Sequence, residues 1–164
     1  MKDARPSKAR FFRDLARIDP KGREAWLNLL RAHRVATSQI SSALVAKHHI
    51  TLEELELLVH LGSSDEPKRM SDLAKEVYLS SSGMTRMVDR LQRRGLVSQR
   101  AGTADRREAR AEITASGLDL LAAASRTHTD ALEQNFIRLL SRDELKVLAA
   151  SLGKVAQGPP SEPP

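Results

Sequence analysis

Arginine and serine side chains that could contact DNA concentrate in one segment of the chain, between Ser80 and Thr114. From Arg86 to Arg110 this segment holds eight arginines against three acidic residues, a net charge of +5, whereas the whole chain of 164 residues carries +6. Arginine suits phosphate and the guanine edge because its planar guanidinium donates two parallel hydrogen bonds. Runs of charge are also common on solvated surfaces that bind nothing. The charge alone therefore does not distinguish a DNA-binding surface from an ordinary solvated one, and the secondary structure that holds these side chains must be considered.

The first half of this segment is predicted to be an α-helix. Its apolar residues recur at i, i+3, i+4 and i+7, a spacing that places side chains on one helical face. They are Met84, Met87, Val88 and Leu91. Ser80 or Ser81 can cap the first turn, and Gly95 stands where a left-handed residue would end the helix. The opposite face is polar and carries Ser82, Thr85, Arg86, Asp89, Arg90 and Arg93.

A shorter helix and a hairpin flank this polar helix in the sequence. The shorter helix is marked by Met70, Leu73, Ala74 and Val77, with Ser71 as its candidate N-cap. Only residues 78–80 separate the two helices, which is the turn length of a DNA-binding helix-turn-helix. Residues 96–114 change to two short stretches around a Gly-Thr-Ala-Asp turn, which predicts a β-hairpin. This order of elements favours DNA binding over an idle charged surface.

These residues resemble the MarR family of bacterial winged-helix transcription regulators. The resemblance extends from about Trp26 to Val155 and rests on four pieces in a fixed order. They are the helix of residues 80–94, the Gly-Leu-Val strand start at 95–97, the wing Asp105-Arg106-Arg107, and the helix start Thr114-Ala-Ser-Gly117. Glu108 stands where many members carry glycine. The resemblance implies a mainly α fold with a small β-hairpin wing, a winged helix-turn-helix that dimerises through its N- and C-terminal helices.

The whole chain is predicted to be one domain with two tails. Residues 1–20 form a basic N-terminal extension, partly helical in this prediction, residues 21–157 form the winged-helix domain, and the proline-rich residues 158–164 form a disordered tail. Within the domain, a DNA-reading lobe spans about 51–114. Dimerisation helices span about 21–46 and 114–156. The apolar stripes of these long helices could equally pack on the chain's own core.

Local signals place the remaining elements. A first helix from about Lys21 to Ala46 carries Trp26, Leu29, Leu30, His33, Thr37, Ile40 and Leu44 along one side. Capping-box patterns open a helix at Thr51, with Leu55, Leu58 and Val59 facing inward, and a last helix at Ser141 with Leu145, Leu148, Leu152 and Val155 in register. Residues 63–69 are predicted to be a loop, and Thr114 caps a helix that runs to about Leu140.

Eight side chains are predicted to contact DNA. We expect Ser81, Ser82, Thr85 and Arg86 to approach base edges or adjacent phosphates in the major groove, and Arg90 and Arg93 to meet phosphate. The resemblance implies that Arg107 enters the minor groove, that Arg106 shares or takes this role, and that Asp105 holds the wing through a charged hydrogen bond. Alternatively, Asp105 and Arg107 form a salt bridge that only shapes the hairpin. A two-fold dimer predicts a pseudo-palindromic site with half-sites about 10 bp apart.

The resemblance also implies a small aromatic or anionic effector, bound in a cleft between the dimerisation helices and the lobe. Trp26 and His33 lie two turns apart near the start of such a cleft, and Arg34 could neutralise an anion. Equally, Trp26 and His33 are core residues of an apolar stripe and Arg34 is a solvated neighbour.

Other functions find little support in the sequence. There is no P-loop, no Gly-x-Gly-x-x-Gly and no Gly-x-Ser-x-Gly, and His48-His49 lack the spacing of metal ligands, so we expect no enzyme, cofactor or metal. Cysteine is absent, which excludes disulfides and thiol switches. No apolar run approaches the ~18 residues of a membrane span, and the N-terminus lacks a signal-type apolar block, which predicts a cytoplasmic protein.

The predicted function is a sequence-specific, duplex-DNA-binding transcriptional regulator, with repression as the expected outcome and release by an effector. The alternative is a winged-helix module that binds a protein or RNA without operator specificity, since counterion release favours any polyanion. The low aromatic content of 3% disfavours single strands, because their binders stack bases on aromatic side chains.

Overall fold

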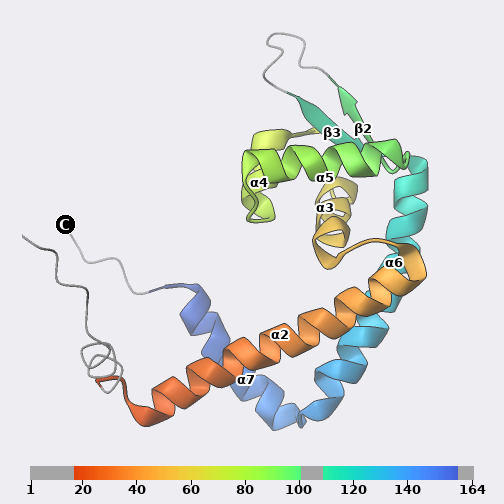
Figure 1. The fold of residues 1–164 in the computed structure, drawn as a ribbon. Helices are drawn as coiled ribbons and strands as arrows, with labels where there is room; N and C mark the ends of the chain where they lie inside the picture. Colours follow the sequence, from red (N-terminus) through yellow and green to blue (C-terminus); the bar gives the residue numbers. More distant parts are fainter. Residues whose placement is uncertain (1–16, 101–108, 159–164) are drawn as a thin grey trace, which may run out of the picture. The chain divides into compact units, whose positions relative to one another are not determined.

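The computed structural model describes residues 17–100 and 109–158 of the chain. It is mainly helical with one small sheet (Figure 1), which confirms the predicted mainly α fold, whereas the predicted dimerisation stays a prediction. The elements in chain order are α2 (Pro20–His48), α3 (Leu52–Gly62), β1 (Lys68–Arg69), α4 (Met70–Glu76), α5 (Ser81–Arg93), β2 (Val97–Arg100), β3 (Arg110–Ile113), α6 (Ala115–Asn135), η1 (Ile137–Leu139) and α7 (Arg142–Ala156).

The described residues divide into two compact units between Ser38 and Gln39, and α2 runs through the division. The second unit holds the predicted DNA-reading lobe. Its core is built from apolar side chains of the last part of α2 and of α3, α4, α5, β2, β3 and α6. The largest fully buried side chains are Leu44, Ile50, Leu57, Leu58, Leu73, Met84, Leu91, Val88 and Val97. The apolar face predicted for α5 is confirmed, because all four of its residues are buried.

One prediction for α3 is wrong. Val59 does not face inward but is 47% exposed, while Leu57 is fully buried. The reason is that α3 contacts α4, β3 and α6, so its buried surface is wider than a single stripe and shifts toward Leu57. Val59 then lies on the remaining solvent-facing strip.

The helix ends follow local side-chain chemistry. Ser80 caps α5 by accepting a hydrogen bond from the backbone N of Gly83 at 3.2 Å, and Thr114 caps α6 in the same way through Gly117 N at 3.0 Å. Both predicted capping boxes, at Thr51 and at Ser141, are formed. Gly95 has φ +70°, the left-handed conformation that a residue just beyond a helix adopts most easily when it has no Cβ.

The sheet has one strand more than the predicted hairpin. Its order is β1-β3-β2, all antiparallel, with Val97 opposite Ile113 and Lys68 opposite Ala111. The prediction of a loop over residues 63–69 is therefore wrong at Lys68–Arg69, which pair with β3. Two residues are too few to show an alternating pattern, so only the neighbouring strand defines β1.

This added strand also moves the start of α4. Met70 N donates to Ala109 O at 3.1 Å, and Met70 is already the first helical residue. The predicted N-cap Ser71 is thus wrong, because it stands inside the first turn. Figure 1 shows α4 leading into α5, with β2 and β3 close behind α5.

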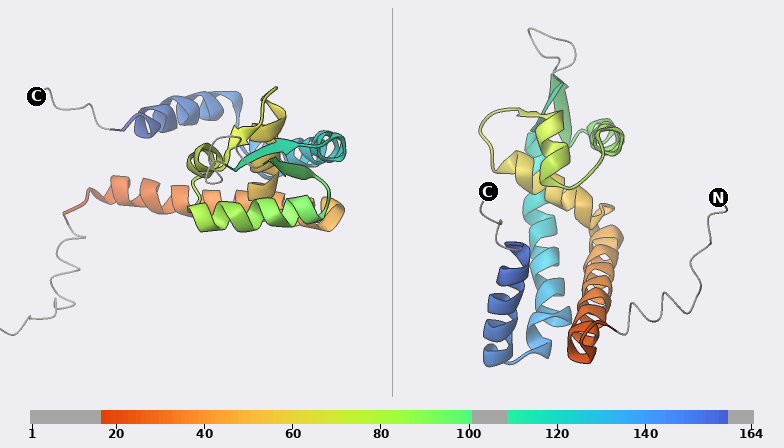
Figure 2. Two further views of the ribbon diagram at one scale, coloured as in Figure 1. Left: turned by 90° about the horizontal axis from the view of Figure 1, so that it is seen from above. Right: turned by 90° about the vertical axis from the view of Figure 1, so that its left-hand side faces the viewer.

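Two long helices end at other residues than predicted. α2 continues to His48, and His49 follows with φ +55°. α6 ends at Asn135 rather than near Leu140, because Phe136 has φ −139° and ψ −60°, and the chain then forms η1. After η1, α7 reverses direction relative to α6 (Figure 2). In the part of the chain that the structure describes, no helix is both long enough and apolar enough to cross a bilayer.

Candidate nucleic-acid interface

The polar face of α5 is the first part of the candidate interface. Its predicted contact residues are all exposed, namely Ser81, Ser82, Thr85, Arg86, Arg90 and Arg93. At about 100° per residue, Arg86 and Arg93 lie within about 40° of Ser82 around the helix axis. The helix therefore gathers two guanidinium groups and a hydroxyl on the side opposite the buried Leu91.

Local hydrogen bonds order the hydroxyl groups at the start of α5. The Oγ atoms of Ser80 and Ser82 lie 3.3 Å apart, and Thr85 Oγ1 donates to Ser81 O at 3.0 Å. Arg86 Nε donates to Ser82 O at 3.3 Å, which holds the arm of this side chain along the helix. Bidentate contact with phosphate or guanine can use the terminal nitrogens of arginine, so it is compatible with this bond.

Arg90 occupies a different environment from Arg86 and Arg93. Its Nε donates to Glu54 Oε1 at 2.6 Å, and the Glu54 side chain is only 3% exposed. About half of the Arg90 side chain, 51%, remains exposed. A phosphate contact by Arg90 stays a prediction, but the ion pair is a partner that the sequence did not reveal.

Arg94, which was not among the predicted residues, also bonds to a neighbouring element. Its Nη1 donates to His49 O at 2.8 Å and its Nη2 to His48 O at 3.2 Å. These carbonyls end α2, so Arg94 supplies donors to a helix terminus that lacks internal ones. An open hollow of about 430 Å³ adjoins this region and is lined by Val45, His49, Ile50, Thr51, Glu54, Arg90 and Arg94.

The strands of the predicted wing are fixed to α5 and to each other. Gln99 Nε2 donates to Asp89 Oδ1 at 3.0 Å, which joins β2 to α5. Across the hairpin, Glu112 pairs with Arg100 at 2.8 Å and accepts from Ser98 Oγ at 2.9 Å. The wing residues Asp105, Arg106 and Arg107 lie outside the described residues, so their predicted roles are untested.

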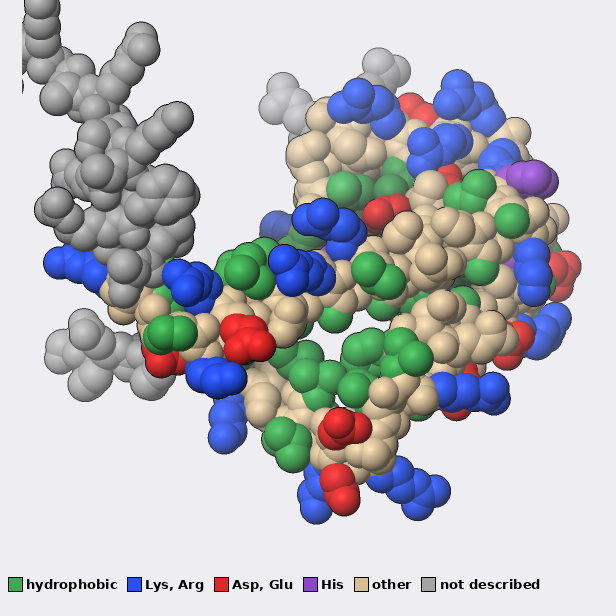
Figure 3. Space-filling view, turned by 60° about the horizontal axis from the view of Figure 1, so that its bottom comes forward, with side chains coloured by type: hydrophobic (Ala, Val, Ile, Leu, Met, Phe, Trp, Pro, Cys, Tyr) green, Lys and Arg blue, Asp and Glu red, His purple; other side chains and the backbone are tan. Residues whose placement is uncertain are grey.

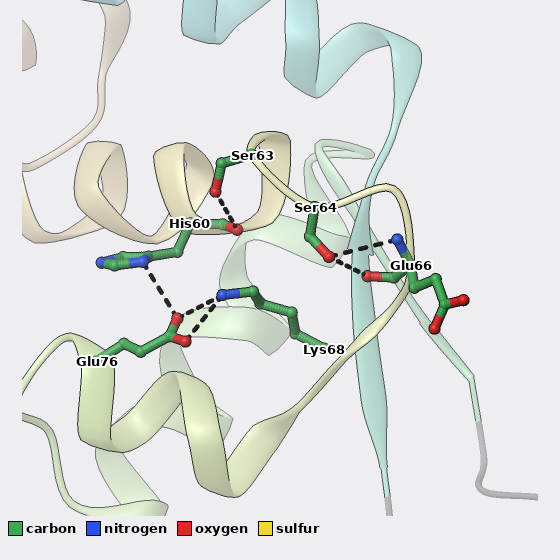
Figure 4. Close-up of polar contacts among 6 residues, drawn as sticks. All are labelled: His60, Ser63, Ser64, Glu66, Lys68 and Glu76. Carbon is green, nitrogen blue, oxygen red and sulfur yellow. Dashed lines mark hydrogen bonds and ion pairs between the residues drawn. The ribbon is translucent and has the colours of Figure 1, made fainter.

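A polar cluster ties α4 to its neighbours. Glu76 of α4 lies 2.8 Å from Lys68 Nζ of β1 and 3.1 Å from His60 Nδ1 of α3, as Figure 4 shows. Beside it, Ser64 Oγ donates to Glu66 O at 2.8 Å and shapes the turn that leads to β1. The helix that precedes α5 is thus held from two sides.

The predicted effector residues lie on the first half of α2. Trp26 is 57% exposed, and His33 and Arg34 are also exposed. These three residues belong to the first unit, whereas every residue that lines the hollow belongs to the second. Their role in ligand binding stays a prediction.

The terminal helices leave apolar side chains open to solvent. α7 has no buried residue, and Val147 and Val155 are 65% and 70% exposed. In α2 only Ile40 and Leu44 are buried, while Leu27 and Leu30 are exposed. Figure 3 shows hydrophobic side chains at the molecular surface, with Lys and Arg side chains around them. Within the single chain described, these stripes are only partly covered.

Comparison with known proteins gives one consistent result. Residues 50–109, a range that includes α3, β1, α4, α5 and β2, match the model of the MarR family. The chain is 29% identical over 138 residues to the HTH-type transcriptional regulator MhqR of Bacillus subtilis, covering 82% of this chain and 91% of that protein.

Solved structures agree with the sequence match. The fold is similar to that of AbsC, a MarR family transcriptional regulator from Streptomyces coelicolor, with a TM-score of 0.76 and 28% identity over 85% of this chain and 95% of AbsC. It is also similar to Sco3205, a regulator of the same family and organism that was solved in complex with DNA. That pair has a TM-score of 0.79 and 25% identity, covering 88% of this chain and 91% of Sco3205.

Proposed function

The chain belongs to the MarR family of winged-helix transcriptional regulators, and from this premise we propose that it represses transcription by binding a specific duplex operator through α5. The family is one of DNA-binding regulators and not of enzymes. The observation that carries the proposal is the exposed face of α5, on which Ser82, Arg86 and Arg93 gather above a fully buried apolar face. A regulator of bacterial genes works where the DNA is, which supports a cytoplasmic location.

We assign Ser81, Ser82, Thr85 and Arg86 to the major groove, because they occupy the first turns of α5 and such residues reach base edges in helix-turn-helix proteins. Arg93 is assigned to phosphate. From the family resemblance we assign Arg106 and Arg107 to the minor groove and Asp105 to the support of the wing.

A binding titration tests operator recognition. The probes are a duplex from the protein's own upstream region, a scrambled duplex, and single-stranded DNA and RNA of the same length. We expect the upstream duplex to bind at least tenfold tighter than the others, within the range of specificity ratios that regulators show. Equal affinities with equal salt dependence would instead support the alternative, a polyanion-binding module without operator specificity.

Substitution of Arg86 tests the face itself. Arg86→Ala should weaken operator binding by about 1 to 3 kcal/mol, or ~5- to 150-fold in Kd. Arg138→Ala is the matched control, because it removes the same charge from an exposed side chain of η1, outside the lobe. If both variants bind equally well, α5 is not the reading element.

We further propose that two chains form a homodimer through α2, α6 and α7 and bind a pseudo-palindromic site. The exposed apolar residues of α2 and α7 support this, since a partner chain would remove them from water. Val155→Asp should shift the mass measured by sedimentation toward that of one chain and lower operator affinity. Gly153→Asp places the same charge at an exposed site of α7, about 160° around the helix from Val155, and should leave both unchanged.

Release by a small aromatic or anionic effector completes the proposed function, with Trp26, His33 and Arg34 as its binding residues. Their exposure on α2 leaves them accessible in the single chain. A thermal-shift screen of aromatic carboxylates should find compounds that raise the Tm of the protein by binding its folded state. Arg34→Ala should abolish the shift; a shift that persists in this variant would remove Arg34 from the site.

A further inference from the structure

We propose that Glu54 and Arg94 position the recognition helix α5 for DNA, and that Arg90 links α5 to Glu54. Together these residues fasten the C-terminal half of α5 to the corner where α2 meets α3. The inference rests on the proposed function, because it concerns how α5 is presented to an operator.

Glu54 is the centre of this arrangement. It is 2% exposed, and both of its carboxylate oxygens are engaged. Oε2 accepts from Thr51 N at 2.8 Å, which completes the capping box of α3, and Oε1 accepts from Arg90 Nε at 2.6 Å. A capping box needs no such burial and no second partner. The second oxygen therefore connects the start of α3 to α5, a contact that spans 36 residues of sequence.

Arg94 makes the second connection, to the end of α2. Its two terminal nitrogens donate to the carbonyl oxygens of His48 and His49. His49 adopts φ +55°, which ends α2 although the residue is not glycine. A cation at a helix C-terminus is favoured because the last carbonyls carry partial negative charge. The two hydrogen bonds from the planar guanidinium of Arg94 thus join the C-terminal end of α5 to the end of α2.

The angular positions on α5 separate these arginines from the DNA-facing ones. At about 100° per residue, Arg93 lies about 20° from Ser82, whereas Arg90 lies about 80° and Arg94 about 120° away. The buried Leu91 lies about 180° away. Arg90 and Arg94 are therefore at the border between the exposed and buried faces, where they reach neighbouring elements. Arg86 and Arg93 remain near the centre of the exposed face.

The sign of the Glu54 charge makes the proposal testable. A carboxylate beside a DNA-binding helix repels phosphate, so its removal should strengthen DNA binding if charge alone matters. If Glu54 positions α5, its removal should weaken operator binding although the chain becomes more positive. Binding to scrambled duplex depends on charge and less on the exact placement of α5, so it should not weaken.

The experiment compares Glu54→Gln with Glu53→Gln, which removes the same charge from an exposed neighbour. We expect Glu54→Gln to lose about tenfold in operator affinity while keeping its affinity for scrambled duplex, a specificity loss of ~1.4 kcal/mol. Its salt slope should equal that of the wild type, because no phosphate contact is lost. Glu53→Gln should bind the operator at least as well as the wild type. An operator affinity for Glu54→Gln equal to that of Glu53→Gln overturns the proposal.

A second variant covers the case in which Glu54→Gln fails to fold, as judged by circular dichroism. Arg94→Lys keeps the charge but replaces the two-pronged guanidinium that reaches two carbonyls, and Arg138→Lys, at an exposed arginine of η1 outside the lobe, is its control. We expect Arg94→Lys to lose about fivefold in operator affinity with an unchanged salt slope, and Arg138→Lys to bind like the wild type. Equal affinities of these two variants overturn the role of Arg94.

Hydrogen exchange in the free protein separates this inference from operator recognition. In Arg94→Lys, amides of residues 90–94 should exchange several-fold faster, while those of α4 stay unchanged. If the wild type shows no operator preference but this change appears, the proposed function fails and the fastening of α5 stands. If the wild type binds its operator and exchange is unaltered, the fastening fails alone.

Discussion

Replacing Gly117 by alanine should loosen the junction between the DNA-reading lobe and α6. Gly117 lies in the first turn of α6, and a Cβ atom built on it would lie 2.2 Å from the carbonyl oxygen of Leu96 and 2.7 Å from Ile113 Cγ1. Both distances are far below van der Waals contact, and the closer one involves backbone. A side-chain rotation therefore cannot relieve the clash.

The surrounding hydrogen bonds resist a backbone shift as well. Leu96 O accepts from Thr114 N at 3.1 Å, and Leu96 N donates to Leu91 O at 3.0 Å. Moving Leu96 away would weaken the contacts that end α5 and begin α6. Overpacking of this kind costs about 1 to 3 kcal/mol. For a chain of this size, that free energy corresponds to a fall in Tm of roughly 2 to 12 °C.

Thermal unfolding followed by circular dichroism provides the measurement. Gly153→Ala is the matched control, because Gly153 lies inside α7 with no atom within 4 Å of its added Cβ. It should leave Tm unchanged or raise it, since alanine favours helix by about 1 kcal/mol over glycine. Both variants must be compared at one protein concentration, because the stability of a dimer depends on it. A Gly117→Ala protein as stable as the wild type would refute the packing argument.

Three further predictions concern single contacts. Gly95→Ala should lower the free energy of unfolding, measured by chemical denaturation, by about 1 to 2 kcal/mol. The cost comes from the backbone, since φ is +70°, and not from a clash, since an added Cβ would meet no atom within 4 Å. Gln99→Ala should weaken operator binding more than binding to scrambled duplex, since it frees β2 from Asp89. The backbone N–H and then the hydroxyl of Ser141 lower the pKa of Glu144, so Ser141→Ala should raise this pKa partway in an NMR titration. Because that pKa is lowered by folding, the contact stabilises above the ordinary value of 4.5 and is lost as pH falls through the lowered pKa.

The elements that sequence analysis predicted correctly depend on short-range chemistry. The caps at Ser80 and Thr114 and the left-handed Gly95 involve bonds within three or four residues, so the residue types nearly determine the geometry. The apolar stripe of α5 is equally local, because it depends only on the spacing of apolar residues within a few consecutive turns, with a period of about 3.6 residues. Such features placed the polar face of α5 before any tertiary contact was known.

The errors arose where a distant segment determines the conformation. β1 exists only because Lys68–Arg69 meet β3, more than 40 residues later, and the start of α4 moved with it. Val59 was misplaced because three neighbours surround α3 and not one. No glycine or proline marks the end of α6 after Asn135. The backbone dihedral angles of Phe136 leave the helical region although phenylalanine is compatible with a helix.

The difference between local and distant contacts also explains why the spacing of the arginines on α5 could not distinguish their roles. Glu54 already had a complete local explanation as the third residue of a capping box, so nothing in the sequence required a second partner. The need for a second partner follows from burial, which the sequence does not show. Glu54 is 2% exposed, so both of its carboxylate oxygens need hydrogen-bond or ion-pair partners, and α5 brings Arg90 within 2.6 Å of one of them. Counting arginines gave the positive charge of this region, but charge alone treats Arg86, Arg90 and Arg94 as equivalent. Their partners differ, and we therefore expect operator specificity to depend on all three while direct phosphate attraction depends on fewer.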